Sequence, residues 1–513
     1  MAKGPNGQMA KAESGGGWGL GVLRHPHFRT IWLAAFGSYV GNWFEFVAVR
    51  WLVAEEVRSL GDQSISAERW MAYLSVAQLC PTLLLGMYGG LVADSVNRRS
   101  LLVATQAAMM AIAVAMATAA YTGHANRWML LGLCLAQGIA VPFNMPAWQV
   151  LTPRLVPKSE LTQAITLNGI SFNVGRTIGP AIAGIIMAMF TTHMVEGAEV
   201  SAEVGGGSGR GAAALLLFNA FTFIVVMIAV LRTPDAPAPA ELRLAWRHPG
   251  VVLSRSLDAL RWVWMHKGPR AVMLALVTFA LLATPVMPLM VLMSRDVHHG
   301  NEAQFGFFTA IMGVGAVSGG LAMRLVPKWY PMHHFIPTAI MLGGVFMLGF
   351  ALAPWVWLAL FFLFFVGVCW MWGFNSTNAA MQHLCSEEMR GRVSAVVNTI
   401  AIGFMPLGPF VVGWAGGLGE RWLGGWKPEM VHVGTSTQLG LAFVAAILLI
   451  AGVVMTIWRT PEVDGLEPGD PLYDRHPGFW RGVFATAHRP KAGKSFNAEG
   501  AEGAERAEER GGG

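Results

Sequence analysis

Residues 89–99 read Gly-Gly-Leu-Val-Ala-Asp-Ser-Val-Asn-Arg-Arg, and the pattern of this stretch returns from residue 319. The second copy has Gly319-Gly320-Leu321 followed by Arg324 and Lys328. A second pattern repeats at nearly the same offset, with Gly179-Pro180 and Gly184 returning as Gly408-Pro409 and Gly413. The chain is therefore duplicated in register. Many secondary transporters are built from such duplicated helix sets, with the substrate path between the halves.

The composition is that of an integral membrane protein. Of the 513 residues, 54% are hydrophobic and only 13% are charged, and the mean hydropathy is +0.48. A soluble protein carries about 25% charged residues, so an ordinary soluble domain is excluded. The net charge of +6 does not indicate a nucleic-acid partner, because basic residues are needed at the cytoplasmic ends of membrane helices.

The cysteines give no sign of a disulfide framework or a metal site. They lie in or beside apolar runs, without a CxxC pattern or a histidine at metal-ligand spacing. We expect them to pack as small apolar residues, and we expect no cofactor. They are Cys80, Cys134, Cys369 and Cys385.

Twelve segments are long and apolar enough to cross a bilayer, which takes about 20 residues. They are 30–53, 70–91, 100–121, 128–148, 161–190, 212–231, 271–293, 305–326, 335–353, 355–378, 394–414 and 439–458. We therefore expect an all-α membrane fold with twelve transmembrane helices in two six-helix halves, residues 30–231 and 271–458. No cleavable signal peptide is evident.

The remaining segments complete this organisation. We expect residues 1–29 to be a cytoplasmic segment, 232–270 a cytoplasmic linker and 459–513 a disordered cytoplasmic tail. Residues 204–214 are glycine-rich and predict a flexible outer loop. In the linker, Leu257, Leu260 and Trp264 follow helical spacing. This spacing predicts an amphipathic helix that either lies on the membrane face or packs on the protein.

The basic residues predict the orientation. Arg98, Arg99, Arg154 and Lys158 occupy short loops on the same side as the basic linker, whereas the opposite loops are diluted by acids such as Glu196. Short loops rich in Lys and Arg stay in the cytoplasm. We therefore expect both termini to be cytoplasmic, in a bacterial inner membrane.

Residues 90–99 resemble the signature loop of the major facilitator superfamily. That loop has glycine, three residues, aspartate, a basic residue, any residue, glycine, arginine and a second basic residue. In this chain Ser95 and Asn97 replace the first basic residue and the second glycine. The resemblance implies that Gly90, Asp94, Arg98 and Arg99 form a latch that holds the two halves together on the cytoplasmic side in one conformation. The alternative is an ordinary solvated turn.

A narrower resemblance covers nearly the whole chain. Residues 28–29 leading into 41–43, residues 146–148 and 155–157, and residues 164–180 are similar to the enterobactin-exporter and macrolide-efflux branch, the transmembrane secretion effector group. Membership implies proton-driven efflux of a bulky amphipathic compound. The branch often has aspartate after the glycine of the first helix, where this chain has Asn42. An amide cannot exchange a proton at working pH.

The fifth predicted span carries a motif that resembles the antiporter motif of the superfamily, and this likeness implies export. Its residues are Gly175, Gly179, Pro180 and Gly184. Small residues let helices approach closely, and proline allows a bend. We expect packing and hinging, and a generic close-packed helix pair is the alternative.

Few ionisable residues lie deep in the predicted spans, where they are usually functional or paired. Glu45 and Arg176 each lie about 22 Å from the cytoplasmic end of their helices, at 1.5 Å per residue. Their equal depth predicts a Glu45–Arg176 pair if the helices face each other. We expect Glu45 to carry the proton and Arg176 to tune it, and the alternative is a structural ion pair.

The first, fourth, seventh and tenth spans line the cavity in this superfamily, so their polar and aromatic residues are candidates for cargo contact. Amides beside aromatics and methionines suit an amphipathic ligand of loose shape. The candidates are Asn42, Trp43, Phe46, Gln137, Asn144, Met287, Met290, Trp370, Trp372, Asn375 and Asn378.

These patterns together predict a secondary transporter, a proton-coupled exporter of a siderophore-like or drug-like molecule that works by alternating access. We expect small-molecule cargo, protons and lipid as its partners, no nucleic acid, and a monomer. A solute importer and a non-transporting membrane protein are the alternatives. The sequence lacks HExxH, paired intramembrane aspartates and a Cys-His arrangement, so we do not expect an enzyme.

Overall fold

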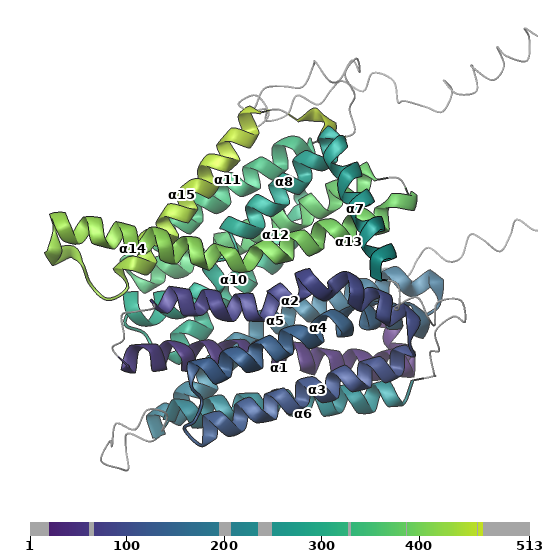
Figure 1. Cartoon of the computed structure of the whole chain (residues 1–513), viewed down its shortest axis with the longest axis horizontal. Coiled ribbons are helices and arrows are strands. Elements are labelled where there is room, and N and C mark those ends of the chain that lie inside the picture. Colours follow the sequence, from purple (N-terminus) through teal and green to yellow (C-terminus); the bar gives the residue numbers. More distant parts are fainter. Residues whose placement is uncertain are drawn as a thin grey trace, which may run out of the picture. The chain divides into compact units, whose positions relative to one another are not determined.

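The computed structural model describes residues 20–60, 66–193, 207–233, 249–326, 330–385, 387–458 and 460–464. Within these ranges every regular element is helical (Figure 1). Of the predicted N-terminal segment 1–29 and tail 459–513, the structure describes residues 20–29, which include the short helix η1 (Leu20–Arg24), and residues 460–464. The all-α prediction is confirmed.

The N-terminal half contains six long helices. They are α1 (Pro26–Ser59), α2 (Ala67–Ser95), α3 (Arg98–Tyr121), α4 (Arg127–Leu155), α5 (Leu161–His193) and α6 (Gly207–Leu231). Asn97 and Asn126 cap the N-termini of α3 and α4, because their side-chain oxygens accept from backbone N–H groups that a helix start leaves unpaired. Asn97, which departs from the family pattern, therefore has a local structural role.

The C-terminal half follows the linker helix α7 (Pro249–Met265). Its helices are α8 (Lys267–Leu282), α9 (Val286–Leu292), α10 (Glu302–Ala322), α11 (Met332–Ala351), α12 (Val356–Leu384), α13 (Glu387–Phe404), α14 (Gly408–Trp426) and α15 (Thr435–Ile457). Short helical segments lie between them: the π-helix η5 (Met293–Val297) and the 3-10 helices η6 (Met323–Leu325), η7 (Met405–Leu407) and η8 (Pro428–Met430). The 3-10 helix η9 (Pro461–Asp464) follows α15.

Two of the predicted spans are broken helices, and their breaks pack together. The helix breaks between α8 and α9 near Pro285, and between α13 and α14 at η7. The Thr284 hydroxyl donates to the Met405 carbonyl across these breaks at 3.2 Å. A Cβ at Gly408 would lie 2.3 Å from both the Leu281 oxygen and a Pro285 side-chain carbon, so only glycine fits there.

Ten helical segments in the described part are long and apolar enough to cross a membrane. The predicted spans 30–53 and 70–91 are helical as α1 and α2, of 34 and 29 residues, but they are not among those ten. α1 carries charged residues along its length, among them Glu45 and Arg50. A total of twelve spans remains our prediction.

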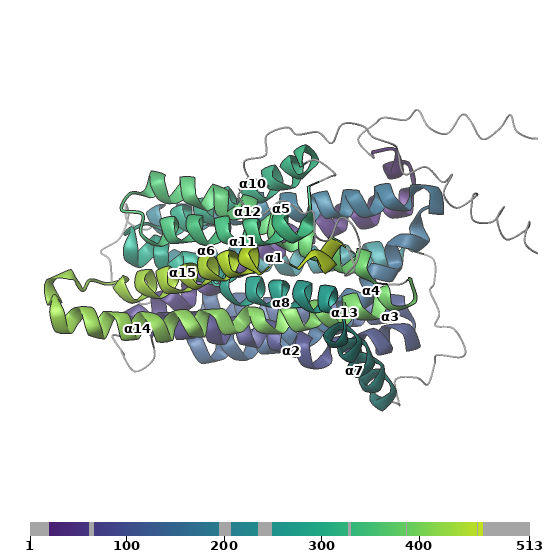
Figure 2. The ribbon, with the colours of Figure 1, turned by 90° about the horizontal axis from the view of Figure 1, so that it is seen from above.

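The helices gather into two bundles that correspond to the halves (Figure 1), and in the view from above one bundle lies over the other (Figure 2). In the N-terminal bundle α1 packs against α5 and α6, and α2 packs against α4. Between the bundles the main contacts join α5 to α10, and α2 to α13 and α14. A Cβ at Gly184 would lie 3.0 Å from the Gly306 Cα, so paired glycines bring α5 and α10 together.

Polar contacts join the bundles at the end that we predict to be outside. The Thr437 hydroxyl donates to Glu68 at 2.7 Å, and the Thr191 hydroxyl donates to Glu302 at 3.1 Å. Arg58 lies 3.9 Å from Asp296. We call these six residues the outer seam. The bundles are closed against each other at this end.

The linker helix packs on the protein. α7 contacts α13, α8 and α2, with Ala259 and Val263 fully buried. Leu257 and Trp264 of the predicted apolar stripe are instead 56% and 53% exposed. The packing alternative is therefore supported, but through a different face of the helix.

The prediction of a flexible outer loop at residues 204–214 is partly wrong. α6 begins at Gly207, and the Ser208 hydroxyl donates to Glu55 of α1 at 2.6 Å. A Cβ built on Gly211 would lie 3.0 Å from the Met187 Cα of α5. The glycines therefore allow close helix packing instead of loop flexibility.

Candidate functional site

Glu45 lies buried in the N-terminal bundle and is 3% exposed. The Gln137 Nε2 of α4 donates to both carboxylate oxygens, at 2.7 and 2.9 Å. The Asn219 Nδ2 of α6 donates to Oε2 at 2.7 Å. One carboxyl group thus joins α1, α4 and α6 through hydrogen bonds from two amide side chains.

Gly41 makes room for this arrangement. A Cβ at Gly41 would lie 2.4 Å from the Asn219 Oδ1 and 3.0 Å from the Thr222 Oγ1. The bare backbone of α1 therefore lets Asn219 approach and reach Glu45, which lies one helical turn further along α1.

A second polar chain lies next to this one. The Arg50 Nη2 donates to the Gln78 Oε1 of α2 at 3.0 Å, and the Gln78 Nε2 lies 3.7 Å from the Cys134 sulfur. The Arg50 guanidinium also covers the Phe46 ring at 3.7 Å. Arg50 is 3% exposed, and it has protein partners for its charge.

Arg176 has no comparable partners. It is 8% exposed, and its Nη2 is fully buried. Within the described part of the chain its guanidinium makes no hydrogen bond or ion pair. The Arg176 guanidinium lies over the Trp370 ring of α12, with the ring centroid 5.9 Å from its Cζ.

The predicted Glu45–Arg176 pair does not form. Trp43 of α1 faces α5, since a Cβ at Gly179 would lie 2.8 Å from its Cβ. Glu45 follows Trp43 by two residues, or about 200° around a helix with 3.6 residues per turn. Its carboxylate therefore faces α4 and α6, away from α5. Glu45 and Arg176 lie at the same predicted depth, but their side chains point toward different helices.

The predicted cargo residues divide into two groups. In the first group, Asn42 and Asn375 are exposed, and Trp370 is half-buried between Phe279 and Arg176. Trp43 is half-buried, with its ring 5.1 Å from Phe46.

The second group is used for packing inside a bundle. Asn144 donates to Thr105 at 2.9 Å, and Trp372 donates to the Gly319 carbonyl at 2.9 Å. Met290 is fully buried and lies 3.7 Å from the Thr309 hydroxyl. Asn378 donates to a carbonyl of its own helix, while Met287 is half-buried beside the core. Gln137, also predicted for cargo, holds Glu45.

The signature loop ends α2 and begins α3. Asp94 lies in the last turn of α2, and its side chain is outside the described part, so the latch remains untested. Arg98 is buried, and Arg99 donates to the Leu231 carbonyl at the end of α6. No atom lies within 4 Å of a Cβ built on Gly90, whereas Gly89 closely approaches Pro142 of α4.

The antiporter-like motif is a packing surface of α5. A Cβ at Gly175 would lie 3.0 Å from the Tyr39 Cβ of α1, next to the Gly179–Trp43 approach. On another side of α5, a Cβ at Gly306 of α10 would lie 2.4 Å from the Pro180 carbonyl. The motif thus brings α5 close both to α1 and to the other bundle.

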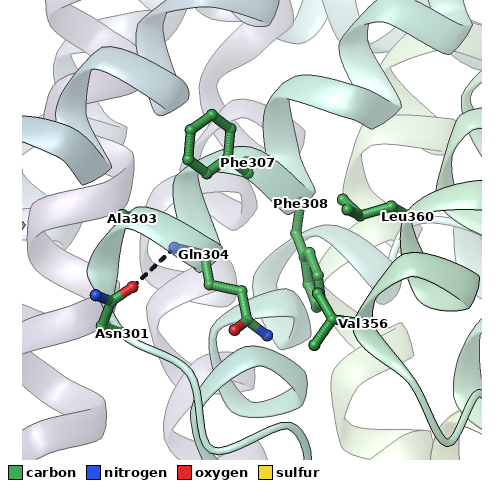
Figure 3. Close-up of a pocket in the computed structure, with 7 residues that line it drawn as sticks. All are labelled: Asn301, Ala303, Gln304, Phe307, Phe308, Val356 and Leu360. Atoms are coloured by element: carbon green, nitrogen blue, oxygen red, sulfur yellow. Dashed lines mark hydrogen bonds between the residues drawn. The ribbon is translucent and has the colours of Figure 1, made fainter.

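A pocket of about 240 Å³ lies elsewhere, at the predicted outer end of α10 and α12. Figure 3 shows Gln304, Phe307 and Phe308 of α10 near Val356 and Leu360 of α12. Asn301, which caps α10, and Ala303 complete the lining. None of these was a predicted cargo residue.

Three functional candidates were missed from the sequence. Asn219 was available as a lone amide in an apolar helix, which is the signal that could have identified it. Glu68 and Glu302 are each 5% exposed, but they precede the predicted spans 70–91 and 305–326 and so resembled loop residues. Both lie in the first turn of a helix, where the helix dipole favours a carboxylate.

Charged contacts also fix segments at the predicted cytoplasmic end. Asp464 of η9 accepts from the Met332 N–H at 2.7 Å and bonds with the His333 ring at the start of α11. Burial raises the pKa of Asp464, but these hydrogen bonds outweigh it and hold the pKa below its usual range. The hydrogen bond from His25, with Arg24 nearby, likewise lowers the pKa of the Glu160 carboxyl.

Comparison with known proteins identifies relatives of the whole transport unit. The family described as transmembrane secretion effector matches residues 18–205 and 207–474. The multidrug efflux pump Tap of Mycolicibacterium fortuitum is 26% identical, over 75% of this chain and 87% of its own. The staphyloferrin A transporter of Staphylococcus aureus is 21% identical, over 74% and 87%. Macrolide efflux protein A of Streptococcus pyogenes is 20% identical, over 74% and 87%.

Solved structures share the fold. A D-xylose–proton symporter superposes with a TM-score of 0.60 at 15% identity, covering 85% of this chain and 99% of its own. A bacterial homologue of the human lysosomal transporter Spinster gives 0.60 at 16% identity, covering 88% and 99%. At this identity the likeness concerns the fold alone.

Proposed function

Because the chain belongs to the transmembrane secretion effector family of the major facilitator superfamily, we propose that it exports a hydrophobic or amphipathic small molecule in exchange for protons. It is a multi-pass membrane transporter, and its relatives named above include efflux pumps and a siderophore transporter. Proton coupling and a siderophore-like or drug-like cargo are the finer parts of the proposal.

The Glu45 arrangement carries the proposal of proton coupling. A carboxylate deep in a membrane protein is rare and commonly belongs to a proton relay or an ion pair. Glu45 has no ion pair among the described residues, but it is held by two neutral amides. Neutral partners do not fix its charge, as an arginine at contact distance would.

The amides can serve both states of the acid. Their N–H groups solvate the ionised carboxylate, and an amide oxygen can accept from the protonated acid. The Gln137 Oε1 is buried without a hydrogen bond among the described residues, so an acceptor is available after rotation of the amide. Protonation would then change how strongly α1 is held to α4 and α6.

The closed outer seam supports alternating access. With Glu68–Thr437 and Thr191–Glu302 bonded, the halves are sealed at the predicted outer end. Export requires that this seam open while the opposite end closes. In the proposed cycle, proton uptake at Glu45 accompanies one of these two changes.

The test uses inverted membrane vesicles with a respiration-driven pH gradient, followed by a quenched acridine dye. Siderophores, macrolides and lipophilic cations are added in turn to vesicles with wild-type protein, Glu45→Gln or Glu429→Gln. Glu429 is an exposed acid near the end of α14, so its variant controls for the lost charge.

We expect dequenching by at least one compound in the wild type and in Glu429→Gln, and its loss in Glu45→Gln. Dequenching that survives in folded Glu45→Gln would place proton coupling elsewhere. A compound that accumulates in vesicles without collapsing the pH gradient would indicate a proton-independent carrier. Uptake into right-side-out vesicles alone would favour an importer.

A further inference from the structure

Arg176 is a buried cation whose charge the described protein leaves uncompensated. Glu45 faces the other side of α1, and no hydrogen bond or ion pair reaches the Arg176 guanidinium from the described residues. Burying a charge without a partner is unfavourable, so such groups are usually paired or functional. The missing partner is an anion.

The position of Arg176 on α5 directs it toward the middle of the molecule. Ile178, Ile182 and Ile185 are exposed and share one side of α5, the side expected to face lipid. Arg176 lies roughly opposite them, at about 100° per residue.

The neighbours of α5 agree with that direction. Gly179 marks the side of α5 that faces α1, and Gly184 marks the side that faces α10. Arg176 falls between these two sides, about 60° from the first and about 80° from the second. The guanidinium therefore lies on the side of α5 that faces the other bundle, in agreement with its contact with Trp370 of α12.

Space is open toward the predicted cytoplasmic end. A Cβ built on Gly169, two turns away on the same side of α5, meets nothing within 4 Å. Phe172, one turn away, is 46% exposed although it does not lie on the lipid side. At the other end the outer seam is closed. A ligand would thus approach Arg176 from the cytoplasmic end.

Trp370 completes the candidate site from the other bundle. Its ring lies 5.9 Å from the Arg176 Cζ, within the range of a cation–π contact. It also packs against Phe279 at 5.2 Å, which fixes its position on α12. An aromatic face beside a guanidinium provides an apolar wall and a charged end.

We propose that Arg176 and Trp370 form a subsite for the carboxylate of an amphipathic cargo. The planar guanidinium presents paired N–H donors that match a carboxylate, and Trp370 contacts the apolar body next to it. Because the subsite spans both bundles, the cargo would bridge α5 and α12. This inference rests on the proposed transport function and names the chemical class of the cargo.

The experiment measures binding to the full-length protein in lipid nanodiscs by fluorescence anisotropy. The probes are tetramethylrhodamine, which has a free carboxylate, and its methyl ester, which has the same ring system without that charge. A second pair, dansyl-undecanoic acid and its amide, repeats the comparison without a cationic ring. The proteins are wild type, Arg176→Gln, Arg176→Lys, Trp370→Leu and Arg421→Gln.

We expect the wild type to bind each acid about tenfold more tightly than its ester or amide counterpart, as a hydrogen-bonded charge pair would give. Arg176→Gln should abolish this preference while leaving the affinity for the neutral amide unchanged and that for the cationic ester unchanged or higher. Arg176→Lys should keep part of the preference, because lysine keeps the positive charge but lacks the paired N–H donors of the guanidinium. Trp370→Leu should weaken both members of each pair.

The control variant Arg421→Gln neutralises an exposed arginine of α14, and it should behave as wild type. The subsite proposal is overturned if the wild-type protein binds the acids no more tightly than their counterparts, or binds neither. A preference that persists in Arg176→Gln also overturns it. If Arg176→Gln does not fold, an acid preference in Arg176→Lys equal to that of wild type, together with unchanged affinities in Trp370→Leu, overturns it.

The result is separable from the proposed function. Proton-coupled export of a neutral compound, with no preference for acids, would overturn the subsite and leave the export proposal intact. An acid preference that depends on Arg176, in a protein without proton-coupled transport, would support the subsite and overturn proton coupling.

Discussion

Glu45 and Arg176 are similarly buried, at 3% and 8% exposed, but their surroundings differ. The Glu45 carboxylate accepts from two amides on two neighbouring helices. The Arg176 guanidinium has an aromatic ring at 5.9 Å and no acceptor among the described residues. Burial alone therefore does not define the role of a charge inside a membrane protein. The partners of each group distinguish the two roles. The fold itself provides hydrogen-bond donors to Glu45, whereas we propose that a ligand neutralises Arg176.

The largest effect is expected from removing the donors of Glu45. The double variant Gln137→Leu/Asn219→Leu removes both amide donors of a buried acid, and a buried polar group left without its partner typically costs about 1–3 kcal/mol of unfolding free energy for each lost partner. Adding Glu45→Leu should restore most of the stability, because apolar side chains then replace the whole polar group. Thermal unfolding in detergent measures both variants.

Asn378→Leu is the control for that series, since Asn378 bonds a carbonyl of its own helix. It should change the stability by less than about 1 kcal/mol, as interhelical bonds are not involved. A double variant as stable as wild type would mean that the amides do not hold Glu45.

A smaller effect is expected from a methyl group at Gly41. In Gly41→Ala the new Cβ would meet the Asn219 Oδ1 at 2.4 Å and displace that amide from Glu45. Overpacking of this kind costs about 1–3 kcal/mol. Gly37→Ala is the matched control one turn away on α1, where a Cβ meets nothing within 4 Å.

The measurement compares unfolding temperatures and proton-coupled transport of the two glycine variants. Gly37→Ala should transport like wild type and unfold at the same or a slightly higher temperature, because alanine is favoured over glycine inside a helix. Equal behaviour of Gly41→Ala and Gly37→Ala would show that α1 does not need close approach to α6 at this point.

Asp464 offers a carboxylate outside the membrane for comparison with Glu45. Its pKa is held below the usual value by His333 and the Met332 N–H, against the effect of burial. A lowered folded-state pKa means that the ionised group contributes stability above the unfolded pKa of about 3.9, and that this contribution is lost as the pH falls through the lower folded value.

Asp464→Asn should therefore weaken the attachment of η9 to α11 by about 1 kcal/mol at neutral pH. Hydrogen exchange of the first turn of α11 should be faster in the variant at pH 7. The difference from wild type should shrink at a pH below the usual range of aspartate. A difference that is equal at both pH values would contradict a role for the ionised carboxylate.

The smallest change in the unfolding free energy, and one of opposite sign, is expected from replacing Arg176. Replacing an unpaired buried charge with an apolar residue should leave the unfolding free energy unchanged or raise it by up to about 1 kcal/mol. Arg176→Met should therefore unfold at the same or a higher temperature than wild type. Arg50→Met should unfold at a lower one, because Gln78 then loses its donor. A clear loss of stability in Arg176→Met would indicate that the fold depends on its charge.

Much of the architecture was predictable from the chain. Long apolar segments mark the helices, because a bilayer requires about 20 such residues and internally bonded backbone. The duplicated glycine patterns indicated two related halves. The breaks near Pro285 and at Met405–Leu407 were not predicted, because the hydropathy of each segment continues through its break.

The candidate site was less predictable. Both ionisable residues were identified from their depth, but Asn219 and the acids of the outer seam were not. Asn144, Met290 and Trp372 were predicted for cargo, but they pack inside the bundles. Their residue types suit either role, so composition could not separate them.

The sequence by itself determined that this chain is a helical membrane protein with two related halves, and at what depth its charges lie. Depth follows from counting residues along a helix with a fixed rise. Only the tertiary structure decided which neighbour each charge faces. A helical period fixes the angle between two residues on one helix, but not which helix packs on either side. Glu45 and Arg176 therefore share a depth and still face different partners.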